Sequence, residues 1–230
     1  MEQQITLRTH HNIMQIENIF KQELSISNER WKVNLYYENE FYGNKSIQII
    51  NNPIRVNNFE IDTLLKIVCI DLSGNETSYF LTGIDGGLYL GLSDKIGDSH
   101  FVKLEGDNLM MSLGFTFVSF NCKTGKIDWK LRPDEIELFE FYEIENDYLV
   151  RGEMSIHRIT KNGEIKWSYG GRDIWVNVNG KKEVQINSDN IHLLDFEDNE
   201  YIIDFNGKTI KDIPKYQPKR ILKKWWEFWK

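Results

Sequence analysis

Cysteine is scarce in this chain, and long apolar runs are missing from it. Its 230 residues include two cysteines, Cys69 and Cys122, each inside an apolar segment typical of a strand. This pattern favours buried structural thiols in a reducing compartment over a disulfide scaffold. No apolar stretch approaches the roughly 20 residues that span a bilayer. The first residues also lack a basic segment followed by an apolar core, the pattern of a secretory signal, so we expect a cytoplasmic protein.

Motifs of catalysis and of cofactor binding are missing as well. The chain has no Gly-x-Ser-x-Gly elbow and no paired Cys-x-x-Cys, and the glycines around Gly86 are not followed by the Gly-Lys-Ser/Thr of a phosphate loop. The adjacent pair His10-His11 would point in different directions on a helix or a strand. Neither Cys nor a carboxylate stands at ligand spacing from His100, His157 or His192. We therefore expect a protein that is not an enzyme, with no cofactor, no metal and no catalytic residue.

One acidic cluster resembles a cation site only superficially. Asp195, Glu197, Asp198 and Glu200 lie close together in the sequence, but their spacing differs from that of an EF-hand and the loop glycine is missing. A solvated loop is the simpler interpretation.

Short β-type runs separated by Asn, Asp and Gly follow one another through most of the chain. Aromatic and β-branched residues are concentrated in residues 31–37, 46–50, 64–72, 78–81, 88–92, 115–120, 148–150, 155–160, 174–178, 183–186, 191–196 and 201–205. Helical spacing of apolar residues occurs only near the ends, at 13–24 and 221–229. Asn-Gly pairs at Gly163, Gly180 and Gly207 suit tight hairpin turns. These features predict an all-β fold of antiparallel hairpins, with short helices at the termini, and exclude a parallel α/β fold.

A weak repeat refines this prediction. Gly125 and Gly163 are each followed four residues later by a tryptophan, Trp129 and Trp167, and Gly207 and Gly74 mark degenerate copies. The distances between these glycines match the length of one four-stranded propeller blade. In the first two copies the pattern resembles the repeat of the PQQ-like, quinoprotein-type β-propellers. The resemblance implies a small or incomplete propeller of meander blades, in which the glycine forms the turn and the tryptophan covers the gap between neighbouring sheets.

The length of the chain limits what this resemblance implies. Quinoprotein dehydrogenases enclose their cofactor with about eight blades, whereas 230 residues allow about five at most. PQQ binding is therefore not expected. A pair of packed antiparallel sheets would use the same hairpins and is the structural alternative. In either case we expect a single domain over residues 1–216, followed by a separate tail, 217–230.

Charge is unevenly distributed along the chain. The net charge is −7, which argues against binding to nucleic acids. Residues 134–147 contain seven acids and no lysine or arginine, interleaved with apolar residues. An alternation of about two residues would make one face acidic and leave the other for the core. This segment is either the solvated face of an outer strand or a docking face for a basic protein, formed by Glu135, Glu137, Glu140, Glu143 and Glu145.

The tail has the opposite character. From residue 215 to the end there are six bases and one acid, together with Trp225, Trp226 and Trp229. Three tryptophans left in water would be unusual. The tail is therefore expected to pack on its own domain or a second copy, to bind a partner protein, or to meet an anionic membrane.

These observations favour a protein-binding module over an enzyme. The leading hypothesis is an interaction protein whose acidic face caps a basic partner, for example an immunity-type inhibitor of a toxin. The alternatives are a propeller enzyme or binding protein for a glycan or another small ligand, and a membrane-associated scaffold attached through the tail.

Overall fold

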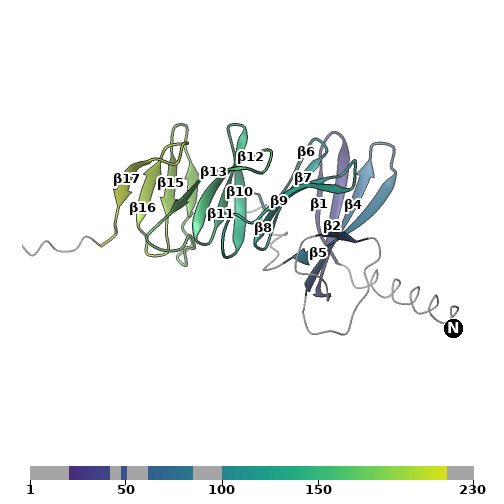
Figure 1. Cartoon of the computed structure of the whole chain (residues 1–230), viewed down its shortest axis with the longest axis horizontal. Coiled ribbons are helices and arrows are strands. Elements are labelled where there is room, and N and C mark those ends of the chain that lie inside the picture. Colours follow the sequence, from purple (N-terminus) through teal and green to yellow (C-terminus); the bar gives the residue numbers. More distant parts are fainter. Residues whose placement is uncertain (1–20, 42–47, 51–61, 85–99, 217–230) are drawn as a thin grey trace, which may run out of the picture. The chain divides into compact units, whose positions relative to one another are not determined.

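The computed structural model describes residues 21–41, 48–50, 62–84 and 100–216 (Figure 1). Every regular element in these ranges is a β-strand, and every pair of neighbouring strands is antiparallel. The chain divides into two compact units, residues 1–170 and 171–230. The prediction of one domain over residues 1–216 stays a prediction.

The first unit begins with a five-stranded sheet in the order β1-β2-β4-β5-β3. Its strands are β1 (Lys21–Ser27), β2 (Trp31–Phe41), β3 (Gln48–Ile50), β4 (Asp62–Asp71) and β5 (Glu76–Ile84). The helix expected over residues 13–24 is wrong for residues 21–24, which belong to β1. Pairing with β2 decides their conformation, because a sheet edge outweighs weak helical spacing in a short segment.

Two four-stranded meanders complete the first unit, each made of consecutive strands. One contains β6 (Val102–Glu105), β7 (Asn108–Leu113), β8 (Thr116–Asn121) and β9 (Lys126–Leu131). The other contains β10 (Leu138–Ile144), β11 (Asp147–Gly152), β12 (Ser155–Thr160) and β13 (Ile165–Gly170).

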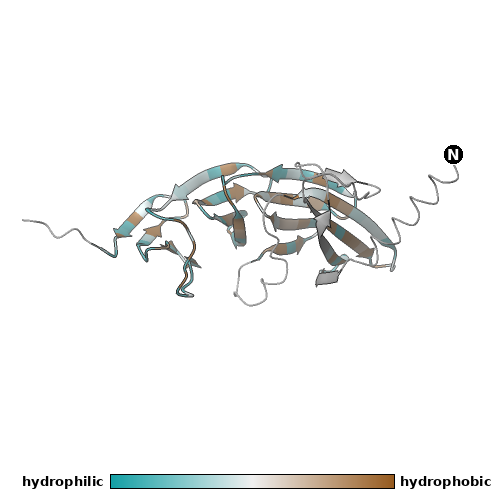
Figure 2. Ribbon diagram, turned by 90° about the horizontal axis from the view of Figure 1, so that it is seen from below, coloured by the Kyte–Doolittle hydropathy of each residue, from teal (hydrophilic) through white to brown (hydrophobic). Residues whose placement is uncertain are grey.

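The β6–β9 sheet is buried on both faces. Leu109 and Met111 pack with the first sheet, in a cluster that includes Leu35 and Leu81. Met110, whose side chain alternates with theirs along β7, packs instead in the second cluster. That cluster also contains Phe117 of β8 together with Phe141, Tyr148, Val150 and Ile159 of the β10–β13 sheet. In the hydropathy view, brown is concentrated on strands and teal on many turns (Figure 2). Apolar residues on both faces make this sheet the centre of the unit.

The second unit contains a third meander. Its strands are β14 (Val184–Ile186), β15 (Ile191–Leu194), β16 (Glu200–Ile203) and β17 (Thr209–Ile213). Residues 174–178 were predicted as a strand but lie in an irregular connection before β14. Trp175 explains the error, because this fully buried side chain fills the core against Tyr201, with ring centroids 5.5 Å apart.

A side-chain acceptor marks the turns of both units. The Thr160 hydroxyl accepts the backbone N–H of Glu164, and the Asp204 carboxylate accepts that of Lys208. A residue with positive φ stands three positions after each acceptor, Gly163 and Gly207 respectively. The same pattern recurs at Asp71, Asn177 and Asp195, where the residues with positive φ are Gly74, Gly180 and Asp198. Three glycines of the sequence repeat, Gly74, Gly163 and Gly207, thus lie in one recurring type of hairpin turn.

Successive meanders of four consecutive antiparallel strands are the architecture of propeller blades, so the predicted fold class is confirmed. The alternative of two packed sheets is wrong, because the described strands form four sheets. Within the described ranges, no helix is long and apolar enough to cross a membrane.

Candidate protein-interaction surface

A buried carboxylate organises one end of the β10–β13 sheet. Asp134 lies in the connection between β9 and β10, and its side chain is 1% exposed. It accepts backbone N–H groups from Ile136 at 3.2 Å, Met154 at 3.1 Å and Ser155 at 2.9 Å. A Cβ atom at Gly152 would lie 2.1 Å from its Oδ2, so only glycine leaves room for the carboxylate there. Asp134 therefore ties the β9–β10 connection to the β11–β12 turn.

Asp134 is also the end of a short polar chain. Its Oδ2 lies 3.4 Å from Nε2 of His157, whose Nδ1 lies 2.8 Å from the Ser168 hydroxyl. Burial opposes ionisation of Asp134, but hydrogen bonds from His157, Ile136 and Ser155 outweigh it and hold the pKa of the carboxyl below its usual value. The group is thus ionised at neutral pH.

Serine, histidine and aspartate in a row suggest nucleophilic catalysis, but a structural role accounts for their positions. His157 and Ser168 are direct cross-strand partners on β12 and β13. Asp134 is occupied by three backbone N–H groups. The sequence gives no sign that these residues meet, because 23 positions separate Asp134 from His157.

We call Asp134 and the backbone N–H groups that it binds the Asp134 hub. Two apolar side chains are exposed beside it. Ile136 is 37% exposed and Met154 is 44% exposed, and their backbone N–H groups bind the same carboxylate. Glu135 is exposed beside them, and Glu137 and Glu153 are half-buried. The N–H of Glu153 donates to the carbonyl of Glu137 at 2.9 Å, which joins the two segments a second time. We call these five residues, 135–137 with 153 and 154, the acidic-apolar surface.

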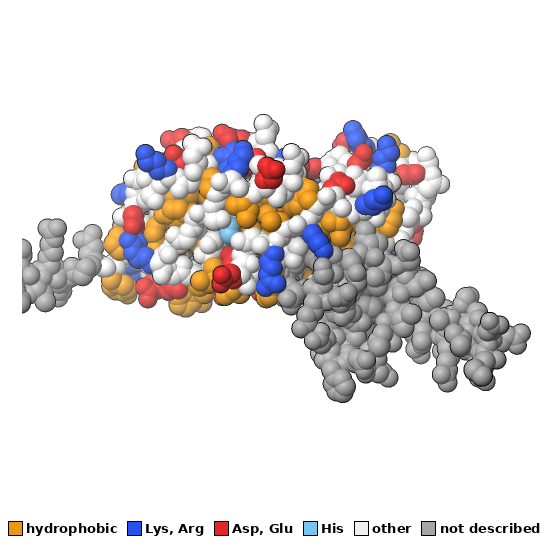
Figure 3. Space-filling view, viewed as in Figure 1, with side chains coloured by type: hydrophobic (Ala, Val, Ile, Leu, Met, Phe, Trp, Pro, Cys, Tyr) orange, Lys and Arg blue, Asp and Glu red, His pale blue; other side chains and the backbone are white. Residues whose placement is uncertain are grey.

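In the space-filling view, hydrophobic side chains are exposed among acidic and basic ones across the visible face (Figure 3). Scattered exposed apolar residues are normal on a protein surface. What distinguishes Ile136 and Met154 is that one buried carboxylate fixes both of their backbones.

The remaining predicted acidic residues do not share this surface. Glu140 is buried, and both of its carboxylate oxygens bind Arg151, at 2.7 and 2.6 Å. The Tyr142 hydroxyl donates to it at 3.0 Å. The expected two-residue alternation is broken by a register shift between Leu138 and Phe141. Glu140 therefore turns inward.

Glu143 and Glu145 lie at the opposite end of the sheet, near the β10–β11 turn. Glu143 is paired with Lys103 and with Lys161, the latter at 3.2 Å. A hydrogen bond with Glu105, followed by those with the two lysines, lowers the pKa of Glu143 to about 2. Glu145 accepts from Arg158 at 2.6 Å.

The premise that these acids are uncompensated is therefore wrong. Asp147 is also neutralised, by Arg158 at 2.6 Å and Lys166 at 2.7 Å. The bases that neutralise the segment come from β6, β11, β12, β13 and the turn after β12, outside the segment itself. Trp225, Trp226 and Trp229 lie outside the described residues.

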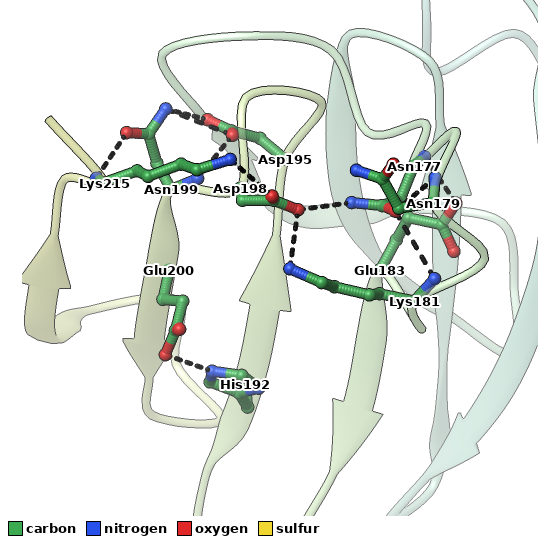
Figure 4. A network of polar contacts seen from close by, with 10 residues as sticks. All are labelled: Asn177, Asn179, Lys181, Glu183, His192, Asp195, Asp198, Asn199, Glu200 and Lys215. Atoms are coloured by element: carbon green, nitrogen blue, oxygen red, sulfur yellow. Dashed lines mark hydrogen bonds and ion pairs between the residues drawn. The ribbon is translucent and has the colours of Figure 1, made fainter.

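The second unit has a comparable hub at Asp198, in the turn between β15 and β16 (Figure 4). Its carboxylate accepts from Asn177 at 2.9 Å, and pairs with Lys181 at 3.0 Å and Lys215 at 2.7 Å. These contacts, led by Lys215 and Asn177, hold the pKa of Asp198 far below its usual value. Asp195 nearby is fully buried and binds Asn199. The expectation of a solvated loop is therefore wrong for Asp195 and Asp198, whereas Glu197 is exposed.

No group of three or more His, Cys, Asp or Glu side chains among the described residues could hold a metal ion. His192 pairs with Glu200 at 3.2 Å, and the backbone of His100 bridges to Phe141. The sequence carries little signal for either hub. Asp134 stands shortly before an apolar strand, and the residue three positions after Asp195 is Asp198 rather than the glycine of the other turns.

No protein-family model and no curated protein sequence matches this chain. Among solved structures, it resembles the crystal structure of BamB from Moraxella catarrhalis, with 11% sequence identity and a TM-score of 0.44. The match covers 79% of this chain and 42% of that chain, so the present chain spans less than half the length of that structure. Strand order and pairing identify the fold class independently of this likeness.

Proposed function

We propose that this chain is a protein-binding module that holds a basic, partly apolar segment of another protein on its acidic-apolar surface. The observation that carries the proposal is the Asp134 hub, which fixes Ile136 and Met154 in exposed positions. A surface held rigid before binding loses little conformational entropy when a partner arrives.

Charge supports a basic partner. Glu135, Glu137 and Glu153 are chain neighbours of the two apolar residues, and the whole chain carries a net charge of −7. One base, Arg132, donates to the Glu135 carbonyl at 3.4 Å. An acidic rim around an apolar centre attracts a cationic partner and suppresses binding of acidic ones. Because Ile136 is 37% exposed and Met154 is 44% exposed, covering the rest of each side chain would supply roughly 1 kcal/mol, less than half of the value for a fully exposed one.

An inhibitor of the immunity type is the finer form of this proposal, since such a protein covers a basic partner without chemistry of its own. The proposed location is the cytoplasm, which the two free, buried thiols support. Neither a cofactor nor a metal enters the proposed activity.

Site-specific photocrosslinking in the source cell tests the surface directly. A benzophenone side chain at position 154 should give one discrete adduct with a basic protein. The matched control is position 72, because Leu72 is 81% exposed but lies in the β4–β5 turn. Glu135→Gln together with Glu137→Gln should weaken the adduct, and added salt should weaken it further.

Equal crosslinking at positions 72 and 154, or none at 154, would count against the proposal. An adduct with an acidic protein would support this surface as a binding site but overturn the proposal that the partner is basic.

A further inference from the structure

We propose that residues 217–230 of this chain pack on an apolar surface of their own unit, at the end of the β14–β17 sheet where the Asp198 hub lies. This surface is formed by Val178, which is 70% exposed, and Phe196, which is 40% exposed. It differs from the acidic-apolar surface, and the inference does not depend on the proposed function.

The hydrogen bonds of the hub join the two backbone segments that carry these apolar residues. Val178 follows Asn177, whose side chain donates to Asp198 at 2.9 Å. Phe196 precedes Asp198 by two positions, and its N–H donates to the carbonyl of Ile174 at 2.8 Å. The connection before β14 and the β15–β16 turn are therefore fixed side by side, as the close-up shows (Figure 4).

The chain leaves the described fold at the same place. The backbone N–H of Lys215 donates to the Asn199 side chain at 3.0 Å, and its ammonium group lies 2.7 Å from Asp198. Tyr216, the last described residue, is 73% exposed. The following segment thus starts beside the Asp198 hub. Its fourteen residues could extend about 45 Å, so reach sets no obstacle.

Composition makes this segment the appropriate occupant. It contains five bases and one acid, a net charge of +4, whereas residues 171–216 contain six bases and nine acids, a net charge of −3. The exposed Glu197 lies between Phe196 and Asp198. Lys181 and Lys215 already neutralise Asp198, so it is the opposite net charges of the two parts, together with Glu197, that favour association.

The aromatic residues of the segment give a second reason. Trp225, Trp226, Phe228 and Trp229 would leave a large apolar area in water if nothing covered them. Each such ring buries roughly 150–250 Å² when it packs fully. Val178 and Phe196 offer apolar area that the segment can reach within its own chain, so that no second molecule is needed to cover the rings.

Fluorine NMR of the full chain labelled with 5-fluorotryptophan tests this packing. A version ending at Tyr216 identifies the signals of the three tail tryptophans by their loss. A synthetic peptide of residues 217–230 gives the chemical shifts of these tryptophans when they are not packed, called the peptide positions below. Packing predicts tail signals displaced from the peptide positions and unchanged on tenfold dilution. Val178→Asp with Phe196→Asp should return them to the peptide positions, while the control Leu72→Asp should not.

Three outcomes would overturn the inference. Tail signals at the peptide positions in the full chain would mean that the tail is free. Displacement that disappears on dilution would assign the contact to a second copy. Displacement that appears only with vesicles of anionic phospholipid would assign the tail to a membrane. Circular dichroism of the double variant verifies that its sheets are intact, and the crosslink at position 154 reports separately on the proposed function.

Discussion

The indole of Trp129 lies against the backbone of Gly163, in the turn between β12 and β13 of the next sheet. A Cβ atom at Gly163 would lie 2.6 Å from the Trp129 ring, and the indole N–H donates to the carbonyl of Lys161 at 3.0 Å. The predicted role of the glycine–tryptophan repeat, in which tryptophan covers the gap between sheets, is thereby confirmed for this copy. Tyr79 and Gly125 have the same relationship one sheet earlier, with a separation of 2.1 Å between the added Cβ and the ring.

Substitution of Gly163 should show how much this contact contributes. Gly163→Ala forces a side chain into the left-handed region, which costs about 1–2 kcal/mol, and displaces the indole, which costs about 1–3 kcal/mol more. The matched control is Gly74→Ala. Gly74 has the same φ of 82°, but nothing lies within 4 Å of its added Cβ.

Urea unfolding of the two variants should therefore differ, with Gly163→Ala the less stable. Addition of Trp129→Ala should make the effect of Gly163→Ala resemble that of Gly74→Ala, because the ring is then gone. Equal losses at both glycines in the original chain would show that the indole contributes nothing there.

Loss of the Asp134 hub should destabilise the first unit. Asp134→Ala leaves three half-buried backbone N–H groups without their acceptor, at about 1 kcal/mol or more each. We expect a total loss of about 3 kcal/mol or more in urea unfolding, together with faster hydrogen exchange at Ile136, Met154 and Ser155. The control is Ser168→Ala, which removes only the hydroxyl at the outer end of the Asp134–His157–Ser168 hydrogen-bond series. It should lower the unfolding free energy less.

The same carboxylate should make stability depend on pH. Because the pKa of Asp134 is lower in the folded state than in the unfolded state, its stabilisation is present above the unfolded pKa of about 3.9. That stabilisation is lost as the pH falls below this value towards the folded pKa. Asp134→Asn should flatten the decline in unfolding free energy between roughly pH 5 and pH 2, and an unchanged slope would contradict this assignment.

The two cysteines should be unreactive in the native protein. Cys69 and Cys122 are buried in one cluster, and hydrogen bonding to Cys69 together with burial raises the pKa of the Cys122 thiol. The predicted buried thiols are thus found as free thiols. Modification by a disulfide reagent at pH 8 should be at least about a thousandfold slower than for an unfolded control, because a core position must open first. Rapid reaction of either thiol without denaturant would refute this.

Sequence patterns predicted strands rich in aromatic and β-branched residues, including the edge strands β3 and β14, but missed the inner strand β7, whose apolar residues are Leu and Met. Segments such as β2, β4, β8 and β12 concentrate aromatic and β-branched residues, and their existence was predicted. The last strands of the meanders, β9, β13 and β17, were missed because they are largely exposed and carry lysines and polar residues among few apolar ones. An edge strand needs only one neighbour, so its sequence is weakly constrained.

The candidate site was predictable only in part. Glu135 and Glu137 were selected by local acidity and lie on the acidic-apolar surface. The inward turn of Glu140 was not predictable, because it depends on a register shift in β10 and on Arg151, eleven residues away. Met154 was missed because a single exposed methionine in a turn carries no local signal. Its position depends on a backbone hydrogen bond to Asp134, twenty residues earlier.

Removing one partner of the buried pair Glu140 and Arg151 should lower the unfolding free energy much more than replacing both partners with apolar residues. Glu140→Ala leaves a buried guanidinium without its counter-ion, so we expect a loss of about 3–5 kcal/mol in unfolding free energy. The double variant Glu140→Leu with Arg151→Met removes both charges at similar volume and should recover most of that loss. Desolvation of two charges offsets much of their attraction, which is why the paired state gains little over an apolar one. A double variant as unstable as Glu140→Ala would show that the stacking of Arg151 on Phe139, at 4.2 Å, contributes more than the ion pair.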